Sequence, residues 1–293
     1  MTTLRHKLLT LAVVCLAVAS ARVTLASTIY DSISNPEPYN LPSLGYQATS
    51  TDEFGDHIEL GGTDRVLTTV RAGMSNWALK STYLDGNDDP LPGYGHVTMD
   101  ASGYEHDLTL NLYNVDTSGV IPVLGSLIGT QTVTAFVPWR PENQGPGDPW
   151  LAPDNNEYNG IFFTVDFDFS GDGITLPEEF VAAVAYNTNT YGASPIGLNG
   201  PYESLNVALS SSPAEPTIGV NVDIDTVFWD TSVAGFYTDG GTAGVDILRA
   251  DTGWTPYTPA LEISAVPEPA TYLMFAAGLL GTCVAYRRRH RTA

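Results

Sequence analysis

The chain has 293 residues, of which 43% are hydrophobic, with 28 glycines and 20 prolines, a composition typical of a globular protein rich in turns. Its 33 acidic residues outnumber its 12 lysines and arginines, and only five of those basic residues lie between Ser27 and Val266. So acidic a surface repels phosphate backbones, which excludes nucleic acid as an expected partner.

The N-terminus has the order of a secretory signal peptide. Two basic residues precede an apolar run over Leu8–Ala19, and small residues follow it. The run is too short to span a bilayer comfortably. Cleavage fits after Ala21 or after Ala26, and we prefer Ala26 because a strand is predicted to begin at Ser27. The sequence therefore predicts a signal peptide over residues 1–26, with the secretory translocon and signal peptidase as partners.

Short runs of alternating apolar and polar residues recur over residues 27–266, each ended by Gly, Pro, Asn or Asp. The clearest runs are Leu108–Leu112, Ile161–Phe169, Leu205–Leu209 and Val220–Ile224, and weaker ones lie at 58–60, 66–70, 133–137 and 261–265. This pattern predicts one all-β domain, an antiparallel β-sandwich with a jelly-roll-like order as an option. A single helix is predicted over Glu178–Tyr186.

The stretch Pro138–Asn159 differs from the rest of the domain. It is rich in Pro, Gly, Asn and Asp and contains Trp139 and Trp150. Long segments of this composition are often functional loops. We therefore predict a long exposed loop here.

One acidic segment has the spacing of a calcium loop and resembles an EF-hand loop. Asp168, Ser170 and Asp172 stand at positions 1, 3 and 5, Gly173 at the turn and Glu179 at position 12. Calcium needs oxygen ligands at such spacings and a bidentate acid that closes the shell. However, a proline lies inside the segment, and a strand rather than a helix is predicted before it. The segment predicts either a calcium site, the one cofactor that the sequence suggests, or an ordinary turn.

No catalytic motif is found between residues 27 and 266. The two cysteines, Cys15 and Cys283, lie in the terminal apolar runs, so the domain has no disulfide and no cysteine ligand for a metal. Its three histidines lack zinc-ligand spacing, and no Gly-x-Ser-x-Gly segment occurs. We therefore expect a protein without enzyme activity.

Aromatic residues leave a second hypothesis open. Tryptophan and tyrosine rings can provide stacking faces for sugars, and the candidate tryptophans are Trp139, Trp150, Trp229 and Trp254. Carbohydrate binding is therefore an alternative function. A secreted glycan-active enzyme is a weaker alternative.

The C-terminus combines three features. Pro267, Glu268 and Pro269 precede an apolar run over 270–286, and a basic end over 287–293 follows, with Arg287, Arg288, Arg289 and Arg291. As a helix, the run would span about 25 Å, just enough for a hydrocarbon core with some thinning. The arginines are expected to stay in the cytoplasm. The sequence therefore predicts a transmembrane helix that anchors an outward-facing domain.

These three features resemble the PEP-CTERM sorting signal, and the resemblance covers residues 267–293. It implies recognition by an exosortase, a membrane enzyme similar to cysteine proteases that cuts near the motif. It also implies a Gram-negative bacterium that makes extracellular polysaccharide, as in a biofilm, with export across the inner membrane and a membrane-anchored precursor. The leading hypothesis is a non-enzymatic protein of the cell surface or extracellular matrix. For the C-terminal tail, a plain single-pass membrane anchor is the alternative to a sorting signal.

Overall fold

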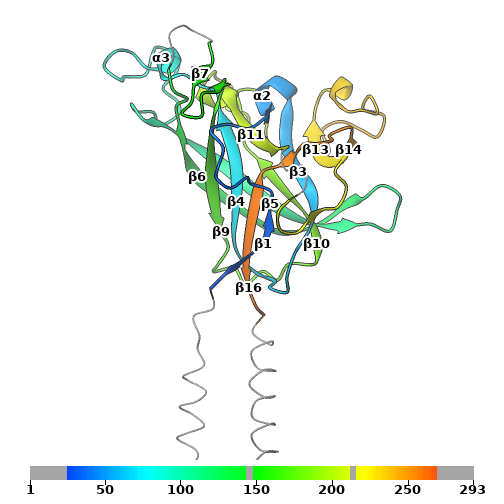
Figure 1. The fold of residues 1–293 in the computed structure, drawn as a ribbon. Coiled ribbons are helices and arrows are strands. Elements are labelled where there is room, and N and C mark those ends of the chain that lie inside the picture. The colour runs from blue at the N-terminus through cyan, green and yellow to red at the C-terminus, as the bar shows by residue number, and fades with distance from the viewer. Residues whose placement is uncertain (1–24, 143–147, 212–215, 269–293) are drawn as a thin grey trace, which may run out of the picture.

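The structure is a computed structural model that describes residues 25–142, 148–211 and 216–268. Within these ranges the chain forms two antiparallel sheets of seven strands each and a separate ribbon of two strands (Figure 1). The helices there are single short turns. The predicted all-β, antiparallel fold is thus confirmed.

The first sheet, sheet A, has the order β1 (Ser27–Asp31), β16 (Leu261–Val266), β4 (Val66–Asn76), β11 (Leu205–Ser210) and β15 (Thr258–Pro259), while β2 (Ser43–Gly45) pairs with β11 and β9 (Ile161–Asp168) with β4. The second, sheet B, has the order β14 (Arg249–Thr252), β13 (Thr226–Thr231), β3 (Thr51–Glu59), β10 (Glu179–Ala185), β5 (Gly103–Asp116) and β6 (Val123–Pro138), while β12 (Val220–Asn221) pairs with β3. The ribbon is β7 (Trp150–Leu151) and β8 (Glu157–Tyr158), and the short helical turns are α2 (Tyr46–Thr49), α3 (Lys80–Tyr83), η1 (Pro201–Ser204) and η2 (Ala234–Phe236).

Both sheets contribute to one hydrophobic core. On β5, the alternating residues Leu108, Leu110 and Leu112 are fully buried, as the period of a strand with one inward face requires. Phe167 of β9 and Ile263 of β16, from sheet A, belong to the same buried cluster. The core therefore lies between the sheets. In an alternating run, the apolar residues lie on the face of the strand that is turned toward this core.

The predicted helix over Glu178–Tyr186 is wrong, because this segment forms the central strand β10. Its two neighbours in sheet B are β3 and β5. All residues from Phe180 to Val184 are buried, so both faces of the strand are covered. A strand that is apolar on both faces shows no alternation, and its alanines favour a helix when the segment is considered alone.

The expectation of an exposed loop over Pro138–Asn159 is also wrong for its two tryptophans. Trp139 is buried and stacks on Tyr83, with ring centroids 5.9 Å apart. Trp150, on β7, is buried too, and its indole Nε1 donates to the carbonyl of Gly160 at 2.7 Å. The described part of the loop is thus held to the body of the domain by these two rings.

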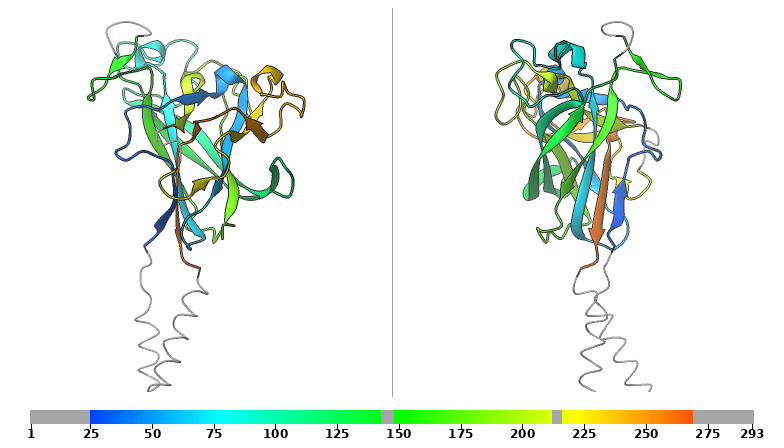
Figure 2. Two further views of the ribbon diagram at one scale, coloured as in Figure 1. Left: turned by 45° about the vertical axis from the view of Figure 1, so that its right-hand side comes forward. Right: turned by 90° about the vertical axis from the view of Figure 1, so that its left-hand side faces the viewer.

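The first and last described strands lie side by side at one end of the molecule (Figures 1 and 2). Ser27 of β1 stands opposite Ala265 of β16, and Val266 stands opposite Val66, the first residue of β4. The 11 residues of β4 then run away from this end and lead directly into Trp77. At about 3.3 Å per residue, Trp77 lies roughly 35 Å from the point where the tail begins.

Candidate functional site

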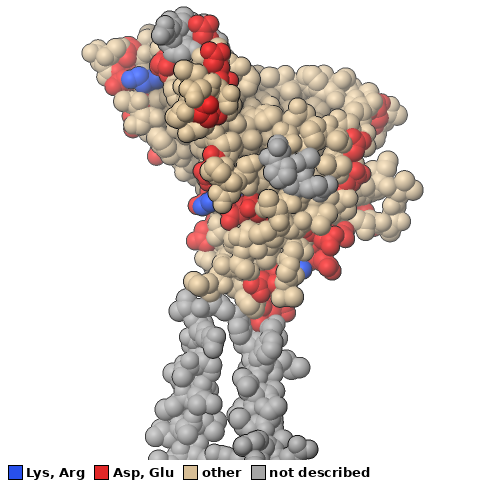
Figure 3. Space-filling view, viewed as in Figure 1, with Lys and Arg blue, Asp and Glu red and all other residues tan. Residues whose placement is uncertain are grey.

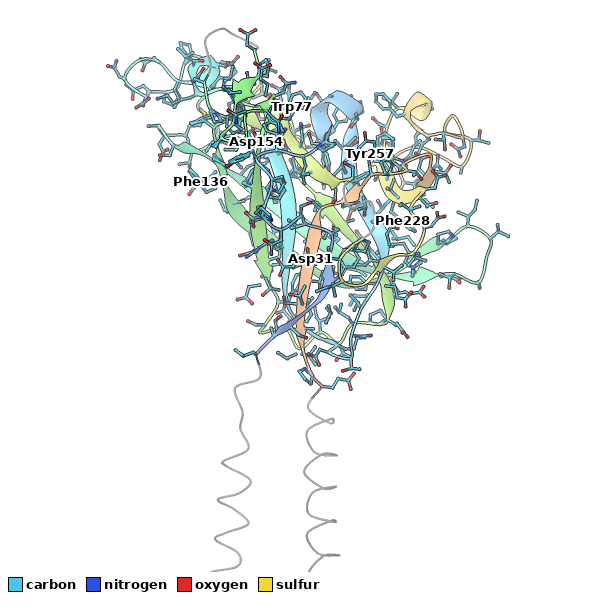
Figure 4. All side chains as sticks on the ribbon, viewed as in Figure 1. Asp31, Trp77, Phe136, Asp154, Phe228 and Tyr257 are labelled. Carbon is cyan, nitrogen blue, oxygen red and sulfur yellow. The ribbon has the colours of Figure 1, made fainter. Side chains whose placement is uncertain are left out.

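Four aromatic residues gather where β4 ends, far from the two chain ends. We call Tyr39, Trp77, Trp150 and Tyr158 the aromatic face. Tyr39 and Tyr158 both contact Trp150, with ring centroids 6.3 and 6.1 Å away. Trp77 is 43% exposed and Tyr39 is 41% exposed, whereas Trp150 is buried. Gly160 lies between the two tryptophans, since its carbonyl accepts from Trp150 Nε1 and its Cα faces Trp77. Figure 4 labels Trp77 at this end of the molecule. The face therefore offers ring surface to solvent on a rigid support.

The position of Trp77 is fixed by hydrogen bonds and by a glycine. Its indole Nε1 donates to Ser75 Oγ at 3.2 Å, and Ser75 Oγ donates to Asn40 Oδ1 at 2.7 Å. Its backbone N–H donates to the carbonyl of Ser204 at 2.9 Å. A Cβ atom at Gly160 would lie 2.4 Å from Trp77 Cδ1. Only glycine at position 160 lets the indole lie where it does.

A polar rim borders the aromatic face. The hydroxyl of Tyr158 donates to Asp154 Oδ2 at 2.8 Å, and Asn156 Nδ2 donates to the same oxygen at 3.0 Å. The backbone N–H of Asn156 donates to Asp154 Oδ1, which holds the pKa of that carboxyl below its usual range. Asp154 is therefore a charged acceptor beside exposed rings. Rings that present a face next to amides, hydroxyls and a carboxylate can bind a ligand that has both apolar C–H surfaces and hydroxyl groups.

The tryptophans that the sequence suggested as stacking faces have other roles. Trp139, Trp150 and Trp229 are buried, and Trp254 packs against Trp229 with centroids 5.1 Å apart. Sequence reasoning missed Trp77, the most exposed of the described tryptophans, because composition says nothing about exposure. The one available signal was its position directly after a long strand, where side chains often leave the core.

The residues of the predicted calcium loop are divided between β9, the following turn and β10. Hydrogen bonds from the side chain and the backbone N–H of Ser170 lower the pKa of the Asp168 carboxyl, and the backbone N–H donates to Asp168 Oδ1 at 2.9 Å. Asp172 lies in the exposed turn, whereas Glu179 begins β10, where its carboxylate lies 3.2 Å from His57 Nε2. Among the residues that the structure describes, no group of three or more His, Cys, Asp or Glu side chains could hold a metal ion. Calcium binding stays a prediction from the sequence.

The sorting residues directly follow the last strand. Pro267 and Glu268 come straight after Val266, the end of β16, and both are half-buried. Pro269, the apolar run over 270–286 and the arginine cluster lie outside the described residues, as does the predicted signal peptide up to residue 24. In the described ranges no helix is long and apolar enough to cross a membrane.

Comparison with known proteins identifies one segment of the chain. The model of the PEP-CTERM protein-sorting motif matches residues 265–289, which include the three predicted motif residues Pro267, Glu268 and Pro269. No curated protein matches the chain, and no solved structure matches it. The matched segment begins within β16, so the sorting signal and the folded domain share their boundary.

Proposed function

We propose that this chain, which carries a PEP-CTERM sorting motif and is thereby an exported substrate of an exosortase, is a non-enzymatic surface or matrix protein that binds extracellular polysaccharide. The binding site in this proposal is the aromatic face, in which Trp77 is the most exposed ring. The motif accounts for export and sorting at a bacterial membrane. The role of the domain rests on its own residues.

The observation that carries the proposal is the position of the aromatic face relative to the tail. Strand β4 has Val66 beside the tail junction at one end and Trp77 at the other. A precursor held in the membrane by its tail would therefore present Trp77 away from the membrane. The same geometry suits a processed protein attached through its C-terminus. Exposed rings at the far end of a tethered domain are placed to meet polymer outside the cell.

Charge restricts the class of polysaccharide. The chain has a formal net charge of −21, and acidic side chains are spread over the face shown in Figure 3, with few basic ones among them. Lys80, one of the few basic residues of the domain, is paired with Asp88 at 2.7 Å. An acidic polymer would be repelled by such a surface. The proposed ligand is therefore a neutral polysaccharide.

Trp77→Ala is expected to weaken binding to neutral polysaccharide by tenfold or more. Removing an exposed stacking ring costs about 1.5–3 kcal/mol, and 1.4 kcal/mol corresponds to a factor of ten in affinity. The measurement is retention of the exported protein on insoluble neutral polysaccharides and its mobility in gels that contain soluble ones. Phe136→Ala is the matched control, because Phe136 is 51% exposed and lies on β6, outside the aromatic face. Equal binding by both variants and the wild type would remove the aromatic face from the proposal.

Replacement of Pro267, Glu268 and Pro269 by alanines is expected to leave the protein uncut and in the membrane. The reason is that these three residues lie in the segment that matches the sorting motif, and that their replacement removes the backbone restriction that each proline imposes. Mass spectrometry of the C-terminus, in the wild type and the variant, gives the result. A released wild-type protein that still carries residues 287–293 would show that no processing occurs. Because this outcome concerns only the tail, it is independent of the polysaccharide test.

A further inference from the structure

The edge strand β6 is unusual in such an acidic chain. Between Asp116 and Arg140 the sequence contains no charged residue. This uncharged segment includes the whole of β6, which stands last in the order of sheet B and has 16 residues. Natural edge strands are commonly protected from pairing with other chains by lysine, proline or an inward-pointing charge. Within β6 the one proline is its last residue, Pro138.

The turn of the β5–β6 hairpin and the adjoining half of β6 carry exposed apolar side chains. We call this segment, residues 117–128, the arm. Val120 is fully exposed, and Ile121, Val123 and Leu127 are each half exposed or more. The turn of the β5–β6 hairpin projects from the body of the domain, visible in teal green in Figures 1 and 2. Exposed apolar groups concentrated in one segment mark an interaction site more often than scattered ones.

A cleft of about 690 Å³ lies between the arm and β14. Its far wall includes Ile247, which is half exposed, and Arg249. Arg249 and Asp239 on that wall are paired with each other, whereas the carboxylates of Asp223 and Asp251 accept hydrogen bonds from the hydroxyl groups of Thr226 and Thr238. Arg249 Nη2 donates to Asp239 Oδ1 at 2.8 Å, and the guanidinium lies 3.6 Å from the ring centre of Tyr237. An uncharged segment that approaches the arm therefore meets apolar side chains and carboxylates that already accept hydrogen bonds within the domain.

The inner face of β6 and its free edge have different surroundings. Near its middle, Gln131 Nε2 donates to the carbonyl of Asp168 at 2.5 Å, and Gly129 lies against the side chain of Ile174. These contacts cover the inner face of β6 where it passes the end of β9. From Val123 to Ile128, the strand pairs with β5 on one side, and the described residues provide no strand on the other. The open edge and the exposed apolar side chains thus coincide in the arm.

We propose that the arm is the contact between two copies of this chain, in which the Val123–Ile128 edges pair antiparallel across a twofold axis. Charge selects a second copy at this position. Two chains with a net charge of −21 repel each other wherever acidic surfaces meet, and the arm itself contains no charged residue that would add to this repulsion. An antiparallel pair of identical edges is self-complementary, as a twofold interface requires, and it joins the two B sheets through backbone hydrogen bonds.

Sedimentation velocity of the full-length protein in detergent tests this inference. Leu127→Asp is expected to raise the dimer dissociation constant tenfold or more, because it places two carboxylates in the contact. Leu151→Asp is the matched control, since Leu151 is an exposed leucine at 66%, on β7, and it should leave association unchanged. The melting temperatures of both variants should equal that of the wild type. A wild type that stays monomeric up to its solubility limit, or equal association of both variants, overturns the proposal.

Cross-linking provides an independent measurement. With Cys15 and Cys283 both replaced by serine, Ser126→Cys introduces the single thiol of the chain in the middle of the open edge, and a short thiol cross-linker should join two copies. Ser194→Cys, in an exposed loop, should give no dimer under the same conditions. Efficient cross-linking through position 194 with none through position 126 would place the contact elsewhere and overturn the proposal.

Discussion

A chain that ends at Ala260 is expected not to fold, whereas a chain that ends at Val266 keeps the complete domain. The difference is β16, which lies between β1 and β4 in sheet A. Its inward side chains Leu261, Ile263 and Ala265 are buried. Burial of each large side chain contributes about 1.5–3 kcal/mol, and the ladders to both neighbours are lost as well. This loss is comparable with the total stability of a typical domain, about 5–15 kcal/mol.

Far-ultraviolet circular dichroism and urea unfolding of the two chains measure the effect. The chain that ends at Val266 should show a β-type spectrum and a cooperative transition, and the chain that ends at Ala260 should show neither. The result also constrains processing, because a cut that removed any of β16 would destabilise the released domain. The C-terminus of the processed protein is therefore expected beyond Val266. A folded chain that ends at Ala260 would contradict the central place of β16.

Asp56→Asn is expected to make the protein more stable than the wild type at pH 8, with little difference at pH 4. Asp56 lies on β3 and is fully buried. Its Oδ2 accepts from Thr258 Oγ1 at 2.6 Å and from Asn221 Nδ2 at 2.9 Å, and its Oδ1 accepts the backbone N–H of His57 at 2.8 Å. Burial raises the pKa of this carboxyl to about 8, although these hydrogen bonds favour the charged form.

The sign follows from proton linkage. The pKa of Asp56 is raised in the folded state, so the folded protein binds a proton that the unfolded chain releases near pH 4. The stability that this proton provides is complete below about pH 4 and is lost as the pH rises through about 8. For one proton, the change approaches about 1.4 kcal/mol per pH unit within that range. Asparagine keeps the shape of the protonated acid and does not titrate. The stability of the variant therefore does not decrease between pH 4 and pH 8 through this position.

The measurement is the difference in the free energy of unfolding between variant and wild type, from urea titrations at several pH values between 4 and 8. Other buried titratable groups are common to both chains and cancel in the difference. Asp172→Asn, at an exposed carboxyl, controls for the change in net charge. If the free energy of unfolding depended on pH in the same way in the variant and the wild type, Asp56 would be charged in the folded protein. Its three hydrogen-bond donors would then outweigh the cost of burying the charge.

Strands with one covered face could be read from the sequence, and strands with two covered faces could not. Leu108, Leu110 and Leu112 alternate with polar residues because the outer face of β5 is less buried than its inner face. Strand β10 is buried on both faces, so its apolar run carries no period. Whether a face is covered depends on neighbours such as β3, which comes from a distant part of the chain. The error over Glu178–Tyr186 has this cause.

The candidate site depends even more on distant contacts. Trp77 and Trp150 are both tryptophans beside strands, yet one is exposed and the other is buried under Tyr39 and Tyr158. Their difference arises from how the segment around β7 and β8 folds back onto the end of β4. No local pattern encodes that arrangement.

By itself, the sequence determined the sorting tail and the β class of the domain, because each depends on residues that are close in the chain. The motif Pro267, Glu268 and Pro269 is read locally, and so is the alternation of a half-buried strand. Tertiary structure alone decided that β16 pairs with β1, that Trp77 lies at the opposite end from the tail, and that β6 has an open edge. These features depend on contacts between residues that are far apart in the chain, and such contacts leave no periodic signal in the sequence.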